Sequence, residues 1–106
     1  MRKKTLGILL STLPTHKNTT TVAGLVRVAS ERQIGISLYL IDDAVQHINH
    51  PILQEFLSPN VKLFVCAYGC MQRKIATSST DKDITFCGLV ILSNIVRGTD
   101  RFLSFN

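Results

Sequence analysis

Two cysteines stand four residues apart in the stretch VKLFVCAYGCMQRKI, residues 61–75. Cys66 ends an apolar run that is typical of a strand, and Gly69 gives the backbone freedom to turn into a helix starting near Cys70. A thiol at this place would face the positive end of that helix, with Arg73 in its first turns, and both favour the nucleophilic thiolate. Cys66 is therefore the first candidate for nucleophilic chemistry. The alternative is a buried strand-end cysteine that packs as a small hydrophobe.

The other two cysteines are weaker candidates. The C-x-x-x-C spacing is neither a C-x-x-C redox motif nor a paired zinc knuckle. On a regular helix the Cβ atoms of Cys66 and Cys70 would be about 5 to 6 Å apart, too far for an unstrained disulfide. Cys70 is thus a second thiol if the loop folds back, and otherwise a packing residue, which is the favoured interpretation. Cys87 has apolar neighbours in FCGLV and is predicted to be inert core filler.

The histidines offer only a weak metal site. His16, His47 and His50 fall in predicted loops. His47 and His50 could bind a metal together with Asp42 or Asp43, but no fourth ligand has a standard spacing. We therefore predict no metal and no cofactor, and we interpret the histidines as solvated loop residues. The sequence has no G-x-G-x-x-G, P-loop or G-x-S-x-G motif.

The composition is that of one folded domain, residues 1–106. The chain is 45% hydrophobic and 18% charged, with six Gly and three Pro. The start MRKKTLGILLSTLP is predicted to be a first strand rather than a secretory signal, because no small-x-small cleavage site follows Leu13. Three cysteines cannot form a closed disulfide framework. We therefore expect free thiols and a cytoplasmic location.

The charge pattern favours no particular large partner. The net charge of +5 comes from 12 Lys and Arg against 7 Asp and Glu, spread along the chain apart from the initial RKK. The five Phe and two Tyr show no RNP-like spacing, so direct nucleic-acid binding is not expected. The longest uncharged run, residues 84–96, is 13 residues and too short to span a bilayer. No membrane partner is expected.

Strands and helices alternate along the chain. Apolar runs predict strands over residues 5–11, 36–41, 60–66 and 100–105. Apolar residues at i, i+3, i+4 and i+7 from Val22 predict a helix that is capped by Asn18, Thr19 or Thr20 and ended by Gly35. Further helices are predicted from Pro51, from about Cys70, and over residues 86–96, which are apolar almost all round and so expected to be largely buried. STDKD, residues 79–83, is predicted to be a surface turn.

This alternation predicts the fold class. Right-handed crossovers imply a three-layer α/β domain with a mainly parallel sheet of four to five strands and helices on both faces. In such sheets reactive groups collect beyond the carboxyl ends of the strands. Cys66, the pair Asp42 and Asp43, and the loop after the first strand all fall there.

With Cys66 in this place, the chain resembles the DsrE/DsrF family of sulfur-relay proteins, which includes the TusD-like subunits. VKLFVCAYGCMQRKI is similar to the family's strand, reactive cysteine and Arg-Gly-containing helix start. ITFCGLVILSNIVRGTDRFLSF resembles its closing helix and Phe-ended strand, IDDAVQHI its Asp-Gly-Val loop, and GILLSTLPTHKNTTTVAGLVRVA its opening strand and helix. The likeness covers nearly the whole chain and rests on the order and spacing of short motifs.

The resemblance implies a sulfur carrier, acting as a sulfurtransferase, that holds a persulfide on Cys66 and passes it to a partner thiol. Arg73 and the helix N-terminus would stabilise the anionic forms. Cys70 would be an additional thiol that many relatives lack, and it could intercept the persulfide to form a disulfide. The resemblance also implies trimers or hexamers, alone or with related subunits, and sulfur exchange with small carriers of the TusA, rhodanese or DsrC/TusE type.

Two residues depart from the family pattern. Lys74 stands where the family usually has Gly after Arg73, and Asp43 replaces the Gly of the Asp-Gly-Val loop. Because glycine permits a positive φ or a close approach of backbone or partner, Lys74 is expected to alter the shape of the mouth beside Cys66.

Two other functions remain open at this point. One is a non-catalytic oligomeric binding module, whose crevice holds a small anion or a partner segment and in which Cys66 is incidental. The other is a metal-binding protein that uses His47, His50 and a cysteine.

Overall fold

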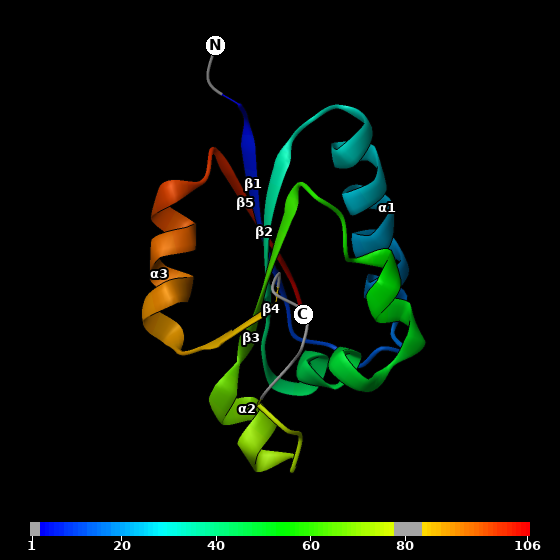
Figure 1. Cartoon of the computed structure of the whole chain (residues 1–106), viewed down its shortest axis with the longest axis vertical. Helices are drawn as coiled ribbons and strands as arrows, with labels where there is room; N and C mark the ends of the chain where they lie inside the picture. Colours follow the sequence, from blue (N-terminus) through cyan, green and yellow to red (C-terminus); the bar gives the residue numbers. More distant parts are fainter. Residues whose placement is uncertain (1–2, 78–83) are drawn as a thin grey trace.

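Five parallel strands form a single sheet at the centre of the molecule (Figure 1). The structure, a computed structural model, describes residues 3–77 and 84–106. In spatial order the strands are β4-β3-β2-β1-β5, and every neighbouring pair is parallel. Their bounds are β1 Thr5–Leu10, β2 Gly35–Leu40, β3 Val61–Cys66, β4 Ile84–Cys87 and β5 Arg101–Phe105.

Helices cover both faces of this sheet. One face carries α1 together with two 3-10 helices, η1 and η2, and the opposite face carries α3 (Figure 1). The short helix α2 continues directly from the end of β3. The bounds are α1 Lys17–Glu31, η1 Asp42–Asn49, η2 Pro51–Glu55, α2 Ala67–Gln72 and α3 Leu89–Gly98. The predicted three-layer α/β fold with a parallel sheet is therefore confirmed.

The main core lies between the sheet and α1. Ile8, Leu38 and Leu63 are opposite one another on β1, β2 and β3 and are all but inaccessible to solvent. Val22 and Val26 of α1 are buried as well, as the predicted helical periodicity requires. These aliphatic side chains hold the three central strands in register.

The opposite face of the sheet admits α3 because β1 contains Gly7. A Cβ atom at Gly7 would lie 2.8 Å from Phe102 Cδ1, 2.9 Å from Thr99 Oγ1 and 3.0 Å from Ile95 Cγ2. These distances are shorter than van der Waals contacts between such atoms. Gly7 thus allows the end of α3 to pack directly on the sheet, beside Phe102 of the neighbouring strand β5.

Residues 84–98 differ from the single buried helix that the sequence predicted. Ile84–Cys87 form the edge strand β4, and helix α3 begins only after Gly88. Within α3 the one buried residue is Ile95, whereas Leu89 is 62% and Val90 75% exposed. The prediction of a largely buried helix was wrong because α3 is an outer layer that contacts the sheet along one side only.

Helix α1 ends at a different residue from the one predicted. Gln33, with φ of 58°, follows the C-cap Arg32. The Ile34 N–H donates to Ala29 O at 2.8 Å and the Gln33 N–H to Ser30 O at 3.3 Å. This pair of hydrogen bonds is a Schellman motif.

Gly35, the residue predicted to end this helix, instead begins β2. The predicted turn over residues 79–83 lies outside the described residues. In the described ranges, none of the helices combines the length and apolar character needed to cross a bilayer.

Candidate functional site

Cys66 is at the junction between a strand and a helix. It is the last residue of β3 and the N-cap of α2, with an extended backbone at φ −65° and ψ 111°. Its Sγ accepts a hydrogen bond from the Gly69 N–H at 3.4 Å. The sulfur thereby takes the place of the side-chain oxygen that caps most helices. Helix α2 begins at Ala67, one turn earlier than predicted. The Cys66 thiol therefore lies beside the first N–H groups of the helix.

A second thiol and a phenol lie beside Cys66. Cys66 and Cys87 are directly opposite each other on β3 and β4, and Tyr39 of β2 is opposite Phe64 of β3. Because side chains alternate along a strand, Phe64 and Cys66 share a face, which places Tyr39, Cys66 and Cys87 together on the α3 side of the sheet. The Tyr39 hydroxyl donates to Gly88 O at 3.0 Å, immediately before α3 begins.

The protons of this group are coupled. Burial raises the pKa of Tyr39, and the adjacent thiols of Cys87 and Cys66 raise it further. Burial also raises the pKa of Cys87, while a hydrogen bond from Tyr39 acts in the opposite direction. The phenol therefore keeps its proton, which it donates to Gly88 O. Burial outweighs the other effects at Cys87, so that the pKa of its thiol stays above the ordinary value.

Sequence reasoning identified neither Tyr39 nor the proximity of Cys87. The signal for Tyr39 was present, since it is the one aromatic residue in the segment ISLYLI. Cys87 was expected to be core filler in a helix, and it is instead partly exposed at the end of an edge strand.

Cys70 is enclosed within the fold. It lies in the middle of α2 and is inaccessible to solvent. Burial raises the pKa of its thiol, the nearby Cys66 raises it further, and Arg73 partly offsets both. Cys70 is therefore a packed side chain close to Cys66.

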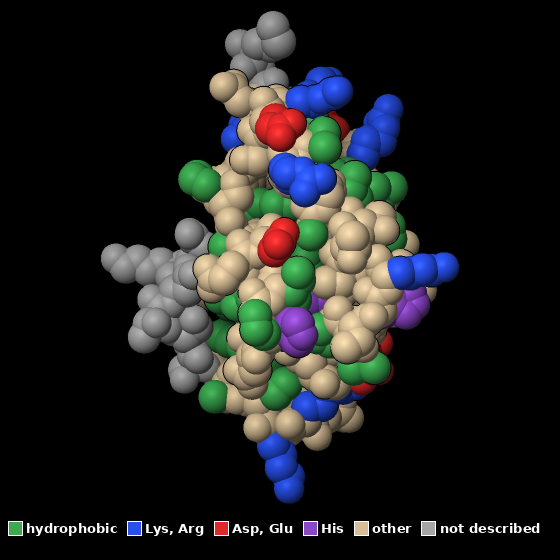
Figure 2. Space-filling view, turned by 90° about the vertical axis from the view of Figure 1, so that its right-hand side faces the viewer, with side chains coloured by type: hydrophobic (Ala, Val, Ile, Leu, Met, Phe, Trp, Pro, Cys, Tyr) green, Lys and Arg blue, Asp and Glu red, His purple; other side chains and the backbone are tan. Residues whose placement is uncertain are grey.

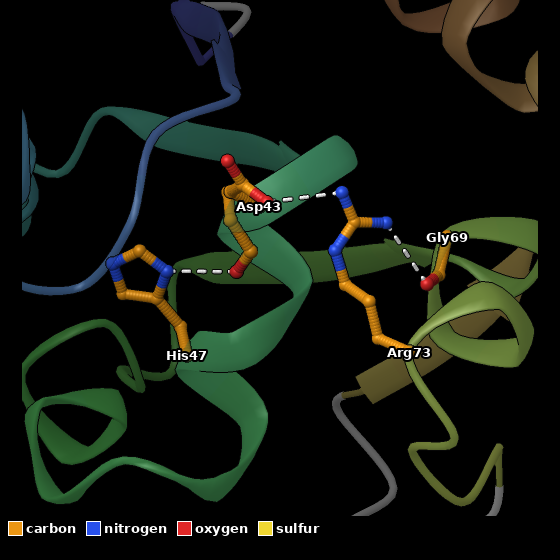
Figure 3. Close-up of polar contacts among 5 residues, drawn as sticks. Asp43, His47, Gly69 and Arg73 are labelled. Atoms are coloured by element: carbon orange, nitrogen blue, oxygen red, sulfur yellow. Dashed lines mark hydrogen bonds and ion pairs between the residues drawn. The ribbon is translucent and has the colours of Figure 1, made fainter.

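Arg73 joins α2 to η1 (Figure 3). Its Nη1 donates to Gly69 O at 3.2 Å, and its Nη2 forms an ion pair of 3.0 Å with Asp43 Oδ1. Arg73 is the C-cap of α2 and not, as predicted, a residue of the first turns. Its positive charge is thus shared between the α2 backbone and a carboxylate from the loop after β2.

Lys74 occupies the backbone conformation for which the family pattern has a glycine. Its φ is 56°, in the left-handed region that glycine adopts most easily. The Lys74 N–H donates to Met71 O at 3.2 Å and the Ile75 N–H to Cys70 O at 2.9 Å, which is a second Schellman motif. In the loop after β2 the positive φ, 53°, belongs to Asp42, whereas Asp43 provides the partner of Arg73.

The histidines have structural partners, which differs from the prediction of solvated loop residues. His47 is fully buried; its Nδ1 is 2.7 Å from Ala44 O, as Figure 3 shows, and its Nε2 is 2.9 Å from Thr19 Oγ1. Burial lowers the pKa of His47. His16 Nδ1 accepts from the Asn18 N–H at 3.0 Å and caps α1 in place of the predicted residues.

His50 in turn caps η2 through its Nδ1, which accepts from the Ile52 N–H at 3.1 Å. No group of three or more His, Cys, Asp and Glu side chains within residues 3–77 and 84–106 could hold a metal ion.

Two open pockets of the described residues lie apart from the thiols. One of about 640 Å³ at the carboxyl ends of the strands includes His50 and Arg73 in its lining but none of the cysteines. Figure 2, which shows the face covered by α1, has basic side chains gathered mainly at the opposite end, where the strands begin. There Lys3, Lys4 and Arg32 line an open pocket of about 560 Å³.

Comparisons with known proteins bear on the fold. No family model and no curated protein matches the sequence. The structure is similar to that of the YchN protein from E. coli, with a TM-score of 0.80 and 18% identity over 98% of this chain and 100% of the other. It is also similar to BT1422 from Bacteroides thetaiotaomicron, described as a conserved protein of unknown function, with a TM-score of 0.70 and 20% identity over 96% and 95% of the two chains. The fold is therefore DsrE-like, as the sequence resemblance implied.

Proposed function

We propose that this chain is a sulfur carrier that holds sulfane sulfur as a persulfide on Cys66 and transfers it to the thiol of a partner protein. The observation that carries the proposal is the place of Cys66, at the end of β3 with its Sγ accepting the Gly69 N–H at 3.4 Å. A backbone donor aimed at a sulfur stabilises its anion. The DsrE-like fold and the sequence resemblance support the same assignment.

The transfer consists of two displacements. The Cys66 thiolate attacks the outer sulfur of a donor persulfide, a bond forms between that sulfur and Sγ, and the donor leaves as a thiolate. An acceptor thiolate then attacks the outer sulfur of the Cys66 persulfide, and Cys66 leaves as a thiolate in its turn. The sulfur moves at a constant oxidation level, so that neither step needs an external oxidant or reductant.

Arg73 has an indirect role in this proposal. Its guanidinium is bonded to Gly69 O, the carbonyl of the same residue whose N–H reaches Cys66. Arg73 would therefore support the anionic forms of the site by holding the first turn of α2 in place. Cys70 lies in that helix as a second thiol, and its complete burial favours a packing role.

The proposal includes assembly and partners. Helix α3 exposes Leu89, Val90 and Val96 to solvent, and a neighbouring set of exposed apolar side chains is typical of an interface. We propose that copies of the chain associate as a trimer or hexamer. The sulfur donors and acceptors would be small carriers of the TusA, rhodanese or DsrC/TusE type, in the reducing cytoplasm where the free thiols persist.

Intact-protein mass spectrometry tests the carrier role directly. The native protein is treated with a small-molecule persulfide and compared with the Cys66→Ser and Cys70→Ser variants. We expect a gain of one sulfur atom, reversed by reductant, in the native and Cys70→Ser proteins and no gain in Cys66→Ser. Absence of added sulfur from native protein whose thiols stay free throughout the treatment would overturn the proposal.

The low exposure of Cys66, 6%, favours a second candidate. In this alternative the chain is an oligomeric binding module, and the pocket lined by His50 and Arg73 holds a small anion or a partner segment. Alkylation of the native protein separates the two functions. A Cys66 thiol that reacts readily supports the carrier, whereas one that reacts only after unfolding supports the module.

A further inference from the structure

We propose that Cys87 is the internal thiol that resolves a persulfide on Cys66, so that the two cysteines act as a dithiol pair. This inference deepens the proposed function and rests on it. It replaces Cys70, four residues from Cys66 in the sequence, with a cysteine 21 residues away that the sheet brings next to it.

The strand register places Cys66 and Cys87 side by side. Cys66 and Cys87 are Cα partners at the carboxyl ends of β3 and β4. Neighbouring strands lie about 4.7 to 4.9 Å apart, which falls inside the range of Cα separations, about 4.4 to 6.8 Å, that disulfides span. Directly opposite residues project from the same face of the sheet. A disulfide also requires the two Cβ atoms to approach within about 3.5 to 4.5 Å. The end of β4 must therefore shift toward β3 as the side chains rotate.

The strand that carries Cys87 is the one best able to make this shift. β4 is at the edge of the sheet that the described residues form, next to β3. Cys87 is its last residue and is partly exposed, whereas Cys70 is inaccessible within α2. An attacking thiol must be able to approach along the axis of the bond it breaks, and Cys87 has more freedom for this than Cys70.

Tyr39 fixes the end of the strand that carries Cys87. Its hydroxyl donates to Gly88 O at 3.0 Å, and Gly88 is the residue that follows Cys87. Tyr39 is thus a positioning residue that holds the strand end beside Cys66.

The resolving step converts the Cys66 persulfide and the Cys87 thiolate to a disulfide and hydrosulfide. The Cys87 thiolate attacks Sγ of the Cys66 persulfide, a bond forms between the two Sγ atoms, and the bond to the outer sulfur breaks. The outer sulfur leaves as hydrosulfide with the electron pair, so that it is reduced while the two cysteines are oxidised to a disulfide. A dithiol reductant, by two thiol-disulfide exchanges, returns both cysteines to thiols. The protein would thereby release sulfide from bound sulfane sulfur in addition to passing it on.

The test is done in a Cys70→Ser background, because trypsin leaves Cys66 and Cys70 in one peptide, residues 63–73, and Cys87 in another, residues 83–97. The protein is loaded with glutathione persulfide, freed of excess reagent and followed by mass spectrometry. We expect the gain of one sulfur atom to give way to a loss of two hydrogen atoms, with release of sulfide. The digest should then contain the two peptides joined by a disulfide.

Replacing Cys87 gives the decisive comparison. In Cys70→Ser/Cys87→Ser the persulfide should persist at least about tenfold longer, because an internal thiol acts at an effective concentration in the millimolar range or above. Cys70→Ser/Cys87→Ala serves as a second variant, with folding of both checked by circular dichroism. A persulfide that decays equally fast without Cys87, or loaded protein that never yields the joined peptides, would overturn the inference.

If Cys66 does not carry a persulfide at all, the experiment gives a different result. If no variant gains sulfur, the carrier proposal falls and the resolving role falls with it. Oxidation of unloaded protein by diamide then examines the pair by itself. Joined peptides 63–73 and 83–97 would support the proximity of Cys66 and Cys87 as a redox pair, and their absence would overturn it.

Discussion

Arg73 and Asp43 form an ion pair of 3.0 Å that connects the end of α2 to the loop after β2. The same guanidinium donates to Gly69 O, so that one side chain joins both ends of α2 to η1. The pair is partly open to solvent, with side-chain exposures of 27% for Arg73 and 51% for Asp43. Its role is to orient the helix that begins at Cys66 more than to stabilise the whole fold.

Removing the carboxylate should therefore change stability little. For Asp43→Asn we expect the free energy of unfolding to fall by less than about 1 kcal/mol, because exposed ion pairs contribute about 0 to 1 kcal/mol. Urea denaturation measures this value. Arg73→Met should lose somewhat more, since Gly69 O then lacks its donor as well. Equal, large losses in both variants would show that the ion pair itself holds the fold together.

His47 should make stability depend on pH. Its folded-state pKa is lowered by burial from the ordinary 6.5, so below pH 6.5 the unfolded chain binds the proton and the folded chain does not. Stability is then complete above about pH 6.5 and declines as the pH falls toward the folded-state pKa, by about 1.4 kcal/mol for each unit by which the pKa is lowered. Urea denaturation at a series of pH values measures the slope.

His47→Asn and His50→Asn provide matched variants for this slope. Asparagine at position 47 can still donate to Ala44 O but does not titrate, so the slope attributable to His47 should disappear. His50 is exposed and caps η2, a role that asparagine also performs. Because the charge of His50 adds to the lowering of the His47 pKa, His50→Asn should reduce the slope only in part. An unchanged slope in His47→Asn would contradict the assignment.

Lys74→Gly should stabilise the protein. The left-handed conformation costs a non-glycine residue about 1 to 2 kcal/mol, which the substitution removes. The greater conformational freedom of glycine in the unfolded chain offsets about 0.5 to 1 kcal/mol of this gain. We expect a net gain of about 0.5 to 1 kcal/mol in the free energy of unfolding. Met71→Gly, at an exposed position inside the same helix, should instead lose about 1 kcal/mol. A loss in both variants would mean that the Lys74 side chain has a stabilising contact that outweighs its backbone strain.

Tyr39→Phe should alter both stability and thiol chemistry. Loss of the hydrogen bond to Gly88 O is expected to lower the free energy of unfolding by about 1 kcal/mol. Because the hydroxyl counteracts the rise in the pKa of Cys87, its removal should move the pH profile of disulfide formation after persulfide loading to more alkaline values. Tyr68→Phe, which removes an exposed phenol on α2, should leave that profile unchanged. Identical profiles for native protein and Tyr39→Phe would exclude a proton-related role for Tyr39.

The order of strands and helices was predictable because the signals were strong and local. Largely apolar runs such as ISLYLI and VKLFVC, each followed by turn residues or a helical pattern, predicted four of the five strands and the fold class. β4 was missed because residues 84–96 are uncharged throughout, and no change in polarity separates the strand Ile84–Cys87 from the helix Leu89–Gly98. Gly88, between the two, was the available signal.

The composition of the site was less predictable, for a geometrical reason. The position of Cys66 follows from its own neighbours in the sequence. The proximity of Cys87 depends on β4 being placed beside β3, and that of Tyr39 on β2 being placed on the other side. The burial of His47 is equally a product of the fold, since Thr19, its partner, comes from a different helix. Pairings between distant segments leave no local pattern from which they could be inferred.

The last strand of the sheet has a consequence for how the chain acquires its structure. β5 lies beside β1, and Thr5 N and Asp100 Oδ2, 95 residues apart, are joined by a hydrogen bond of 2.8 Å. During synthesis β1, β2 and β3 emerge from the ribosome long before residues 101–105, and until then one edge of β1 has no strand to pair with. Such long-range closure is slow compared with local helix formation. The nascent chain therefore passes through an interval with an open apolar sheet edge, during which a chaperone or another nascent copy can occupy the place of β5.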